Sequence, residues 1–335
     1  MAINASPKYQ KAEEQYRAAT DAAGRIAALE EMLRLVPKHK SSEKLQAQLK
    51  QKLKTAREEL HRGHRKGGHA HHDPFHVPRQ GAGQVRLLGA PNVGKSSIVH
   101  RLTKARVEIA EFPFSTHVAV PGMAHHEDVP IQLVDMPPAA GAAPQPGMMN
   151  AYRLTDLILL VVDLAALDLT DQFEHCIELL KAHRMRPVSS PTPDADAENP
   201  SDEALPKRVL VVANKLDTPG ARDNFEAFAE LEQTPLKLMA VSAETGEGLD
   251  AMMAEVFLLL NVIRVYAKKP GRPAEMDAPF ILPRGGTVQD MARLVHKEVA
   301  EKLRTARVWG AGVHDGQQVH ATHVLADKSI VELHV

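Results

Sequence analysis

Residues 85–101, VRLLGAPNVGKSSIVHR, constrain the fold more than any other stretch of this chain. An apolar run leads into a loop framed by Gly89 and Gly94, and helix-compatible residues follow. The loop fits the pattern G-x-x-x-x-G-K-[ST], in which backbone N–H groups of the loop and of the helix N-terminus surround a phosphate. Short patterns of this kind also occur in ordinary turns. The order strand, glycine-framed loop and helix nevertheless favours a phosphate-binding α/β domain.

Two side chains of this loop have predicted roles of their own. Lys95 would reach the β- and γ-phosphates of a nucleotide, and the Ser96 hydroxyl would bind Mg²⁺. The full predicted phosphate-binding set is Gly89, Ala90, Pro91, Asn92, Val93, Gly94, Lys95, Ser96 and Ser97.

Further motifs follow apolar runs that read as buried parallel strands. Asp135 ends the run at 129–135 and lies where a carboxylate would hold Mg²⁺ through water. The sequence Asn-Lys-Leu-Asp at 214–217 follows a second run, and Ser-Ala-Glu at 242–244 follows a third. A helix is expected over 249–266.

The last two motifs suit guanine. Asp217 can accept hydrogen bonds from both N1–H and the 2-amino group, which adenine does not offer in that arrangement. Asn214 can reach N7, the Lys215 stem can lie along the base, and the Ala243 N–H would serve O6. A site built for particular donors rejects a base that lacks them by about 10⁴–10⁵. The predicted base-binding residues are Asn214, Lys215, Asp217, Ser242, Ala243 and Glu244.

The segment before the phosphate loop is basic and helical. Leucines recur at three- and four-residue steps in 9–35 and 43–60, which predicts an amphipathic helical hairpin within residues 1–66. This segment holds 15 Lys and Arg against 8 Asp and Glu, whereas the rest of the chain holds 26 against 34. A basic arm on an acidic body indicates a polyanionic partner, with a solvated helix surface as the alternative.

Two stretches lose periodicity. Residues 67–82 are rich in His, Gly and Pro, and we interpret them as a mobile linker. A metal site is the alternative, because six histidines lie in or just before them: His61, His64, His69, His71, His72 and His76. Residues 187–206 are acidic and proline-rich, and predict a flexible insertion.

Composition narrows the cellular setting. A single cysteine, Cys176, excludes an internal disulfide and fits a reducing compartment. The first twenty residues lack the charged-then-apolar pattern of a secretion signal. The longest apolar stretch is too short to span a bilayer, so no membrane association is expected.

The motifs GAPNVGKSS, FPFST, DMPP, NKLD and SAETGEGLD resemble the Obg-related GTPases of the translation-factor class. Within that class, the chain is most similar to the developmentally regulated GTP-binding proteins. Three features carry this narrower resemblance: the basic hairpin, the segment VYAKKPG at 265–271 that follows the G domain motifs, and the tail FILPRGGTVQDMARLVHKEVAEKL…ARVWG. The resemblance implies an α/β fold: a Ras-like P-loop G domain over 83–267, an N-terminal helical hairpin and a C-terminal β-grasp TGS domain over 278–335. The helix of that last domain is expected over 288–303.

The same resemblance implies a function. It implies a cytoplasmic GTPase that binds GTP and GDP and works with the ribosome or another structured RNA, and a regulatory protein partner. Thr116, with Ser115 as second choice, would close over Mg²⁺ beside Ser96 and Asp135, so Lys95 and Thr116 are the predicted catalytic residues. Related potassium-activated GTPases carry an asparagine at the position of Asn92, which indicates K⁺ as a second cofactor. The alternative is an asparagine that only supports the loop.

Two departures from the family pattern affect hydrolysis. The family's D-x-P-G reads DMPP here, and proline has no N–H with which Pro138 could contact the γ-phosphate. The Ala139 or Gly141 N–H is the candidate substitute. Ala139 also stands where many GTPases carry a water-orienting glutamine, so hydrolysis should be slow. The alternative function is a scaffold that GDP or GTP stabilises without significant hydrolysis.

Overall fold

The computed structural model describes residues 22–36, 49, 51–53, 73–103, 118–139, 144–190 and 204–335. The chain divides into two compact units, Met1–His72 and Asp73–Val335. In the first unit, helix α2 (Ala22–Leu35) contributes Leu29 and Met32 to an apolar cluster with Leu49 and Leu53. The predicted hairpin is therefore represented by α2 and a short helical stretch, and the rest of it lies outside the described residues.

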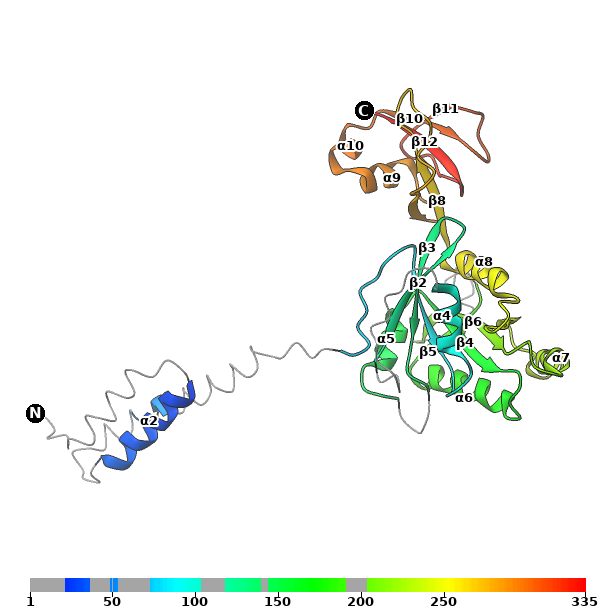
Figure 1. The fold of residues 1–335 in the computed structure, drawn as a ribbon. Helices are drawn as coiled ribbons and strands as arrows, with labels where there is room; N and C mark the ends of the chain where they lie inside the picture. Colours follow the sequence, from blue (N-terminus) through cyan, green and yellow to red (C-terminus); the bar gives the residue numbers. More distant parts are fainter. Residues whose placement is uncertain are drawn as a thin grey trace, which may run out of the picture. The chain divides into compact units, whose positions relative to one another are not determined.

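Within the second unit, a mostly parallel sheet forms the centre of the larger lobe, which ends near residue 260 (Figure 1). Its order is β2-β3-β1-β4-β6, and β5 and β7 pair with successive halves of the free side of β6. Only β2 and β3 pair antiparallel among the described strands of this sheet. The strands are β1 (Gln84–Leu88), β2 (Val120–His126), β3 (Val129–Asp135), β4 (Leu157–Asp163), β5 (Met185–Val188), β6 (Leu205–Asn214) and β7 (Lys237–Ala240).

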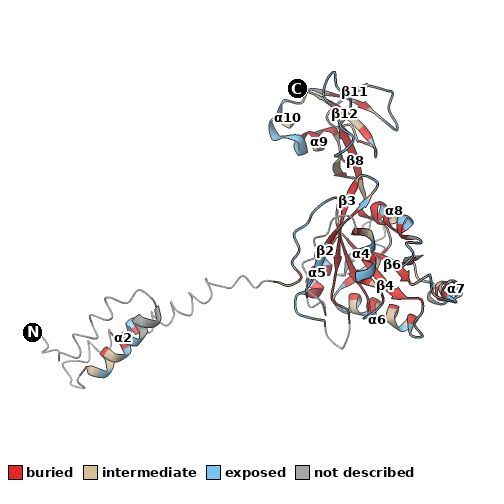
Figure 2. Ribbon diagram, viewed as in Figure 1, coloured by how far each residue is buried: buried red, intermediate tan, exposed pale blue. Residues whose placement is uncertain are grey.

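Helices cover both faces of this sheet, which explains why its central strands are continuous apolar runs. Every residue of β1 and β4 is buried (Figure 2). One face packs against α4 (Lys95–Thr103) and α8 (Leu249–Leu260). The other packs against α5 (Met148–Leu154), α6 (Leu169–Ala182) and α7 (Ala221–Glu232). The carboxyl ends of the parallel strands share one edge, where such folds bind ligands.

A second sheet follows, in the order β11-β10-β12-β8-β9. Its apolar core includes Val265, Val308 and Val331 from three strands and Val288 and Met291 from the helix α9. The side chain of Thr287 caps α9 in a reciprocal bond pair with Asp290. The elements are β8 (Val262–Ala267), β9 (Phe280–Pro283), α9 (Val288–Val295), α10 (Lys297–Lys302), β10 (Thr305–Trp309), β11 (Gln317–Val319) and β12 (Ser329–His334).

The structure corrects two predicted helices. The helix expected over 249–266 ends at Leu260, because Asn261 adopts a left-handed conformation (φ 56°) and the β-branched residues beyond it form β8. The helix expected over 288–303 is divided into α9 and α10 at His296, whose backbone is extended.

The structure describes parts of two segments that the sequence predicted to be flexible. From Asp73 onward the 67–82 segment packs on the G domain, where Phe75 is fully buried and the Pro74 carbonyl accepts the Ala119 N–H. The 187–206 segment contributes Pro187 and Val188 to β5, and its end begins β6. Residues 67–72 and 191–203 lie outside the described residues, as do all the linker histidines except His76.

Candidate nucleotide-binding site

The loop after β1 has the backbone conformation that a phosphate-binding loop needs. Gly94 has φ 91°, and a Cβ there would lie 2.2 Å from the Asn214 Nδ2. A Cβ at Gly89 would lie 2.3 Å from the Val161 carbonyl oxygen of β4. Gly94 requires glycine because its φ is positive and the buried Asn214 amide lies beside it, and Gly89 requires glycine because the backbone of β4 leaves no room for a Cβ.

Lys95 is held inside this loop. Its Nζ donates to the carbonyl oxygens of Gly89 (3.0 Å) and Ala90 (2.9 Å), and 6% of the residue is exposed. Burial lowers the pKa of Lys95, and the nearby Asp135 carboxylate opposes that shift. The ammonium group lies where it can exchange carbonyl oxygens for phosphate oxygens.

Ser96 and Asp135 form the candidate magnesium site. The Ser96 hydroxyl donates to the Asp135 Oδ2 at 2.5 Å, although the two residues come from α4 and β3. Burial raises the pKa of Asp135, against the hydrogen bond from Ser96. The Asp135 Oδ1 is buried, and no donor among the described residues reaches it. An unpaired buried carboxylate oxygen beside a hydroxyl fits a hydrated Mg²⁺. Thr116 and Ser115, the predicted partners, lie outside the described residues.

Asn214 connects the phosphate loop to the last predicted base-binding loop. Its Nδ2 donates to the Val93 carbonyl oxygen (2.9 Å), and its Oδ1 accepts the Ala243 N–H (3.0 Å). Only 2% of Asn214 is exposed. The Ala243 N–H, which we predicted would serve guanine O6, is therefore occupied by Asn214 in this structure.

The predicted carboxylate for guanine is exposed at the same edge. Asp217 Oδ1 accepts the Ser242 hydroxyl at 2.5 Å, and Ser242 Oγ in turn accepts the Thr245 N–H at 3.0 Å. These bonds fix the Asp217 side chain while it stays accessible to a base. Glu244 is exposed beside them.

Sequence reasoning missed two residues that support the site. Asp163, the last residue of β4, binds the Lys215 Nζ at 2.5 Å and so orients the lysine whose stem would lie along the base. Asp163 could have been identified from the sequence, because it ends a central strand as Asp135 does. Arg101 donates to the Thr245 carbonyl oxygen at 2.9 Å and fixes the last loop to α4. No motif marks Arg101.

The departures after Asp135 have a structural consequence. Pro138 is half-buried, and the Ala139 methyl group packs in the core with 7% of the residue exposed. The Ala139 N–H donates to the Gly89 carbonyl oxygen at 3.0 Å. That N–H, a candidate substitute for the missing glycine donor, is already paired, and Gly141 lies outside the described residues.

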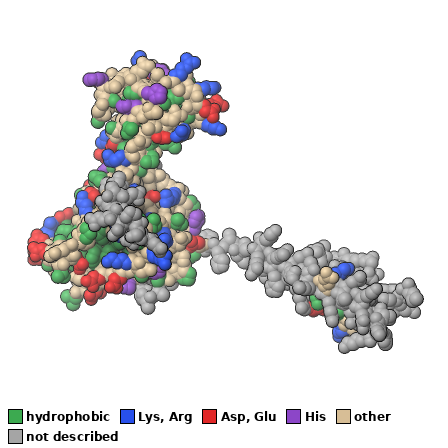
Figure 3. All heavy atoms as spheres, turned by 180° about the vertical axis from the view of Figure 1, so that it is seen from behind, with side chains coloured by type: hydrophobic (Ala, Val, Ile, Leu, Met, Phe, Trp, Pro, Cys, Tyr) green, Lys and Arg blue, Asp and Glu red, His purple; other side chains and the backbone are tan. Residues whose placement is uncertain are grey.

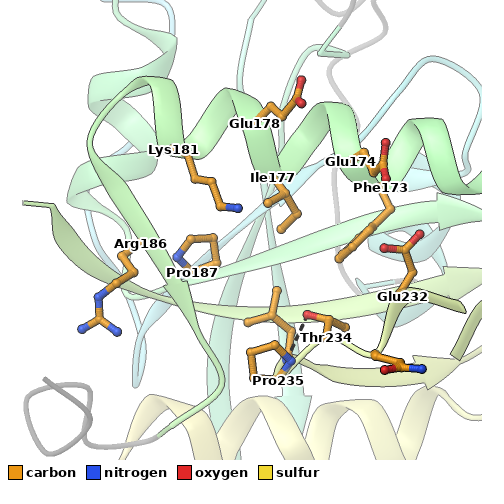
Figure 4. Close-up of a pocket in the computed structure, with 12 residues that line it drawn as sticks. Phe173, Glu174, Ile177, Glu178, Lys181, Arg186, Pro187, Glu232, Thr234 and Pro235 are labelled. Atoms are coloured by element: carbon orange, nitrogen blue, oxygen red, sulfur yellow. Dashed lines mark hydrogen bonds between the residues drawn. The ribbon is translucent and has the colours of Figure 1, made fainter. Parts of the chain in front are cut away.

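A cavity of about 490 Å³ lies away from these residues (Figure 4). It is bounded by α6, β5 and the connection between α7 and β7. Phe173 and Ile177 point into it from α6, and Glu174 and Glu178 point away (Figure 4). None of the predicted nucleotide-site residues lines this cavity.

Two family models match the chain. The model described as 50S ribosome-binding GTPase matches residues 84–190, and the TGS domain model matches residues 263–335. The fold and the site thus define a P-loop GTPase domain followed by a TGS domain.

Two relatives are similar to nearly the whole chain. The sequence is 29% identical to an uncharacterised GTP-binding protein of Methanocaldococcus jannaschii, over 92% of this chain and 91% of the relative. The chain is 27% identical to developmentally regulated G-protein 2 of Arabidopsis thaliana, over 92% and 90% of the two chains. These matches confirm the resemblance to the developmentally regulated GTP-binding proteins.

A solved structure supports the fold. The crystal structure of a GTP-binding protein from Pyrococcus horikoshii OT3 matches with a TM-score of 0.50 at 16% identity. The match covers 75% of this chain and 99% of that one. None of the helices in the described part of the chain combines the length and the apolar character that a bilayer-spanning helix needs.

Proposed function

We propose that this chain is a slow GTPase that couples its nucleotide state to binding of structured RNA, with the ribosome as its main partner in the cytoplasm. The bridge made by Asn214 carries the nucleotide part of the proposal. One buried side chain holds the phosphate loop at Val93 and the base loop at Ala243, so both halves of one nucleotide would be bound by a preorganised edge.

Charge supports the RNA part. Residues 1–66 are basic, and the TGS domain adds a second group of six Lys and Arg side chains, all of them exposed in the structure. Figure 3 shows Lys, Arg and His side chains on the surface of this domain, the upper lobe of the view. The family whose model matches residues 84–190 is described as ribosome-binding. The six residues are Arg284, Arg293, Lys297, Lys302, Arg304 and Arg307.

Hydrolysis would use few protein groups. Lys95 would stabilise charge on the β- and γ-phosphates, and Mg²⁺ would be held by Ser96, Thr116 and, through water, Asp135. Ala139 has only a methyl group, which cannot orient the attacking water. Turnover without a partner should therefore be slow, and a regulatory protein or the RNA itself would accelerate it.

A scaffold that binds nucleotide without hydrolysing it is the second candidate. The Ala139 N–H bonded to Gly89 favours it, because the segment after Asp135 then has one fewer donor for a γ-phosphate. Steady release of phosphate from GTP separates the two candidates. Lys95→Ala is the control, since turnover that survives this change comes from a contaminant.

Potassium should accelerate hydrolysis under this proposal. Asn92 is exposed in the phosphate loop, so its side chain is accessible to a cation beside the phosphates. Its φ of 63°, which asparagine tolerates, also fits the alternative of loop support. Such a cation would stabilise the charge that develops between the β- and γ-phosphates. Turnover is measured in KCl and in NaCl at equal ionic strength, with Asn92→Ala for comparison. Equal rates in the two salts would show that Asn92 only supports the loop.

RNA binding should depend on the basic segment and weaken steeply as salt rises, because phosphate contacts release counterions. We expect the full chain to sediment with ribosomes at low salt and a chain beginning at Asp73 to sediment far less. That shorter chain keeps Phe75 and the whole second unit. Its GDP affinity serves as the folding control. If both chains sediment equally, or neither does, the basic segment is not an RNA-binding element.

A further inference from the structure

The G domain and the TGS domain meet at a buried arginine. Arg264 lies in β8, the first strand of the TGS sheet, and 3% of it is exposed. Its Nη1 donates to the carboxylates of Glu127 and Asp128 (2.8 Å to Asp128) in the turn between β2 and β3. Its Nε donates to Asp327 (3.2 Å) in the loop before β12. We call Arg264, Glu127, Asp128 and Asp327 the Arg264 cluster.

Neighbouring groups reinforce this cluster. The Tyr266 hydroxyl donates to the second oxygen of Asp128 at 2.7 Å, and Lys328 pairs with Glu127 at 3.0 Å. The guanidinium lies 4.8 Å above the Phe257 ring of α8, a helix of the G domain. Two cations therefore face three carboxylates. Arg264 pairs with all three, and Lys328 pairs with Glu127.

The contact between the two domains depends on the positive charge of Arg264. Burial alone would lower the pKa of Arg264, but its hydrogen bonds with Asp128 and Asp327 raise that pKa above the ordinary value. The side chain stays charged at every accessible pH. Without it, carboxylates from the two domains would face one another with only Lys328 to compensate, and like charges repel.

The β2–β3 hairpin connects this cluster to the nucleotide site. Its register pairs Val120 with Asp135 at one end and His126 with Val129 at the other. Asp135 belongs to the candidate magnesium site, and β2 starts four residues after the predicted metal ligand Thr116. Strands of this length span about 20 Å. The hairpin thus has the candidate magnesium site at one end and the contact with the TGS domain at the other.

We infer that Arg264 is a positioning residue that transmits the nucleotide state of the G domain to the TGS domain through the β2–β3 hairpin. The inference deepens the proposed function and rests on it. A change at Asp135 or in the segment before β2 alters the position of the Glu127–Asp128 turn, and the salt bridges move β8 and the loop before β12 with it. By linkage, RNA bound to the TGS domain changes nucleotide affinity by the same factor.

Hydrogen exchange tests the inference without RNA. Exchange in β8 and β12 is compared between the GDP complex and the complex with a non-hydrolysable GTP analogue. We expect a nucleotide-dependent difference in the native chain and its loss in Arg264→Gln, while the GDP affinity of this variant stays within a factor of about two. Lys269→Gln is the matched control, because it removes an exposed ion pair with Glu275 outside the cluster. It should keep the difference.

Asp128→Asn addresses the contact from the G-domain side and keeps the inference testable if Arg264→Gln does not fold. This change removes one charge and preserves shape, and it should reduce the difference. No nucleotide-dependent difference in the native chain, or an undiminished one in the variants that fold, would overturn the inference.

Ribosome sedimentation separates this inference from the proposed function. The native chain should bind ribosomes with affinities that differ by about fivefold or more between its GTP-analogue complex and its GDP complex. In Arg264→Gln the ratio of these two ribosome affinities should approach one. Nucleotide-dependent binding that is equal in both chains contradicts the inference and leaves the proposed function intact. Absence of binding in the native chain contradicts the proposed function, and the exchange experiment still decides the inference.

Discussion

Asp217→Asn should weaken GDP binding by about a thousandfold or more. The carboxylate is the only group assigned to accept from both N1–H and the 2-amino group of guanine, and an amide directs its own N–H at one of them. A buried or partly buried donor left without an acceptor is costly, and sites built on such bonds discriminate by about 10⁴–10⁵. Titration with fluorescent GDP measures the loss.

The same substitution should change base preference in a predictable direction. Xanthine carries a carbonyl oxygen where guanine carries the 2-amino group, so the amide that replaces the Asp217 carboxylate can donate to it. We expect xanthosine diphosphate to compete better than GDP in the variant and worse in the native chain. The Ser242 hydroxyl, now 2.5 Å from the Asp217 carboxylate, can bond the amide oxygen instead.

Asp223→Asn is the matched control for that experiment. Asp223 is an exposed carboxylate in the first turn of α7, near Asp217 in the chain and outside the site. Its variant should bind GDP as the native chain does. If ATP displaces labelled GDP from the native chain as well as GTP does, Asp217 does not read guanine and the assignment is wrong.

Local chemistry explains which parts of the site were predictable from sequence. Gly89, Gly94 and Lys95 occur in a fixed spacing because the loop must approach a phosphate closely. In the structure a Cβ at Gly89 would meet the backbone of β4, and a Cβ at Gly94 would meet the Asn214 side chain. Asp135 and Asn214 follow apolar runs, and parallel strands bring such residues to one edge. The order of these elements therefore predicted the fold and the edge of the sheet where the candidate site residues lie.

Contacts between distant segments were not predictable in this way. The apolar run of 249–260 continues past Asn261, so periodicity alone does not locate the end of the helix. The left-handed Asn261 ends it, and pairing with β9 and β12 makes 262–267 a strand. Phe75 lies in a stretch rich in His and Pro, yet it is fully buried in the core of the G domain. The Arg264 cluster joins residues more than 130 positions apart, and no local pattern marks such a contact.

Pro138 stands where the resemblance to the family implies a glycine, and its replacement should have the second largest effect. Pro138→Gly supplies an N–H where the family uses one to contact the γ-phosphate. A hydrogen bond to a charged group contributes about 1.5–3 kcal/mol, so the affinity for a GTP analogue relative to GDP should rise about ten- to a hundredfold. Both affinities are measured by competition against the same labelled GDP, because the ratio cancels any general loss of stability from the more flexible backbone.

Pro138→Ala distinguishes the new N–H from backbone freedom. Alanine adds the donor without the conformational range of glycine, so both variants should raise the ratio if the donor is the cause. A rise with glycine alone would show that the native segment is too rigid to reach the γ-phosphate. In that case the Ala139 N–H, which is bonded to Gly89 at 3.0 Å in the native structure, is the donor that contacts the γ-phosphate once the loop moves. An unchanged ratio in both variants would mean that the segment after Asp135 does not sense the γ-phosphate, which leaves that task to the segment around Thr116.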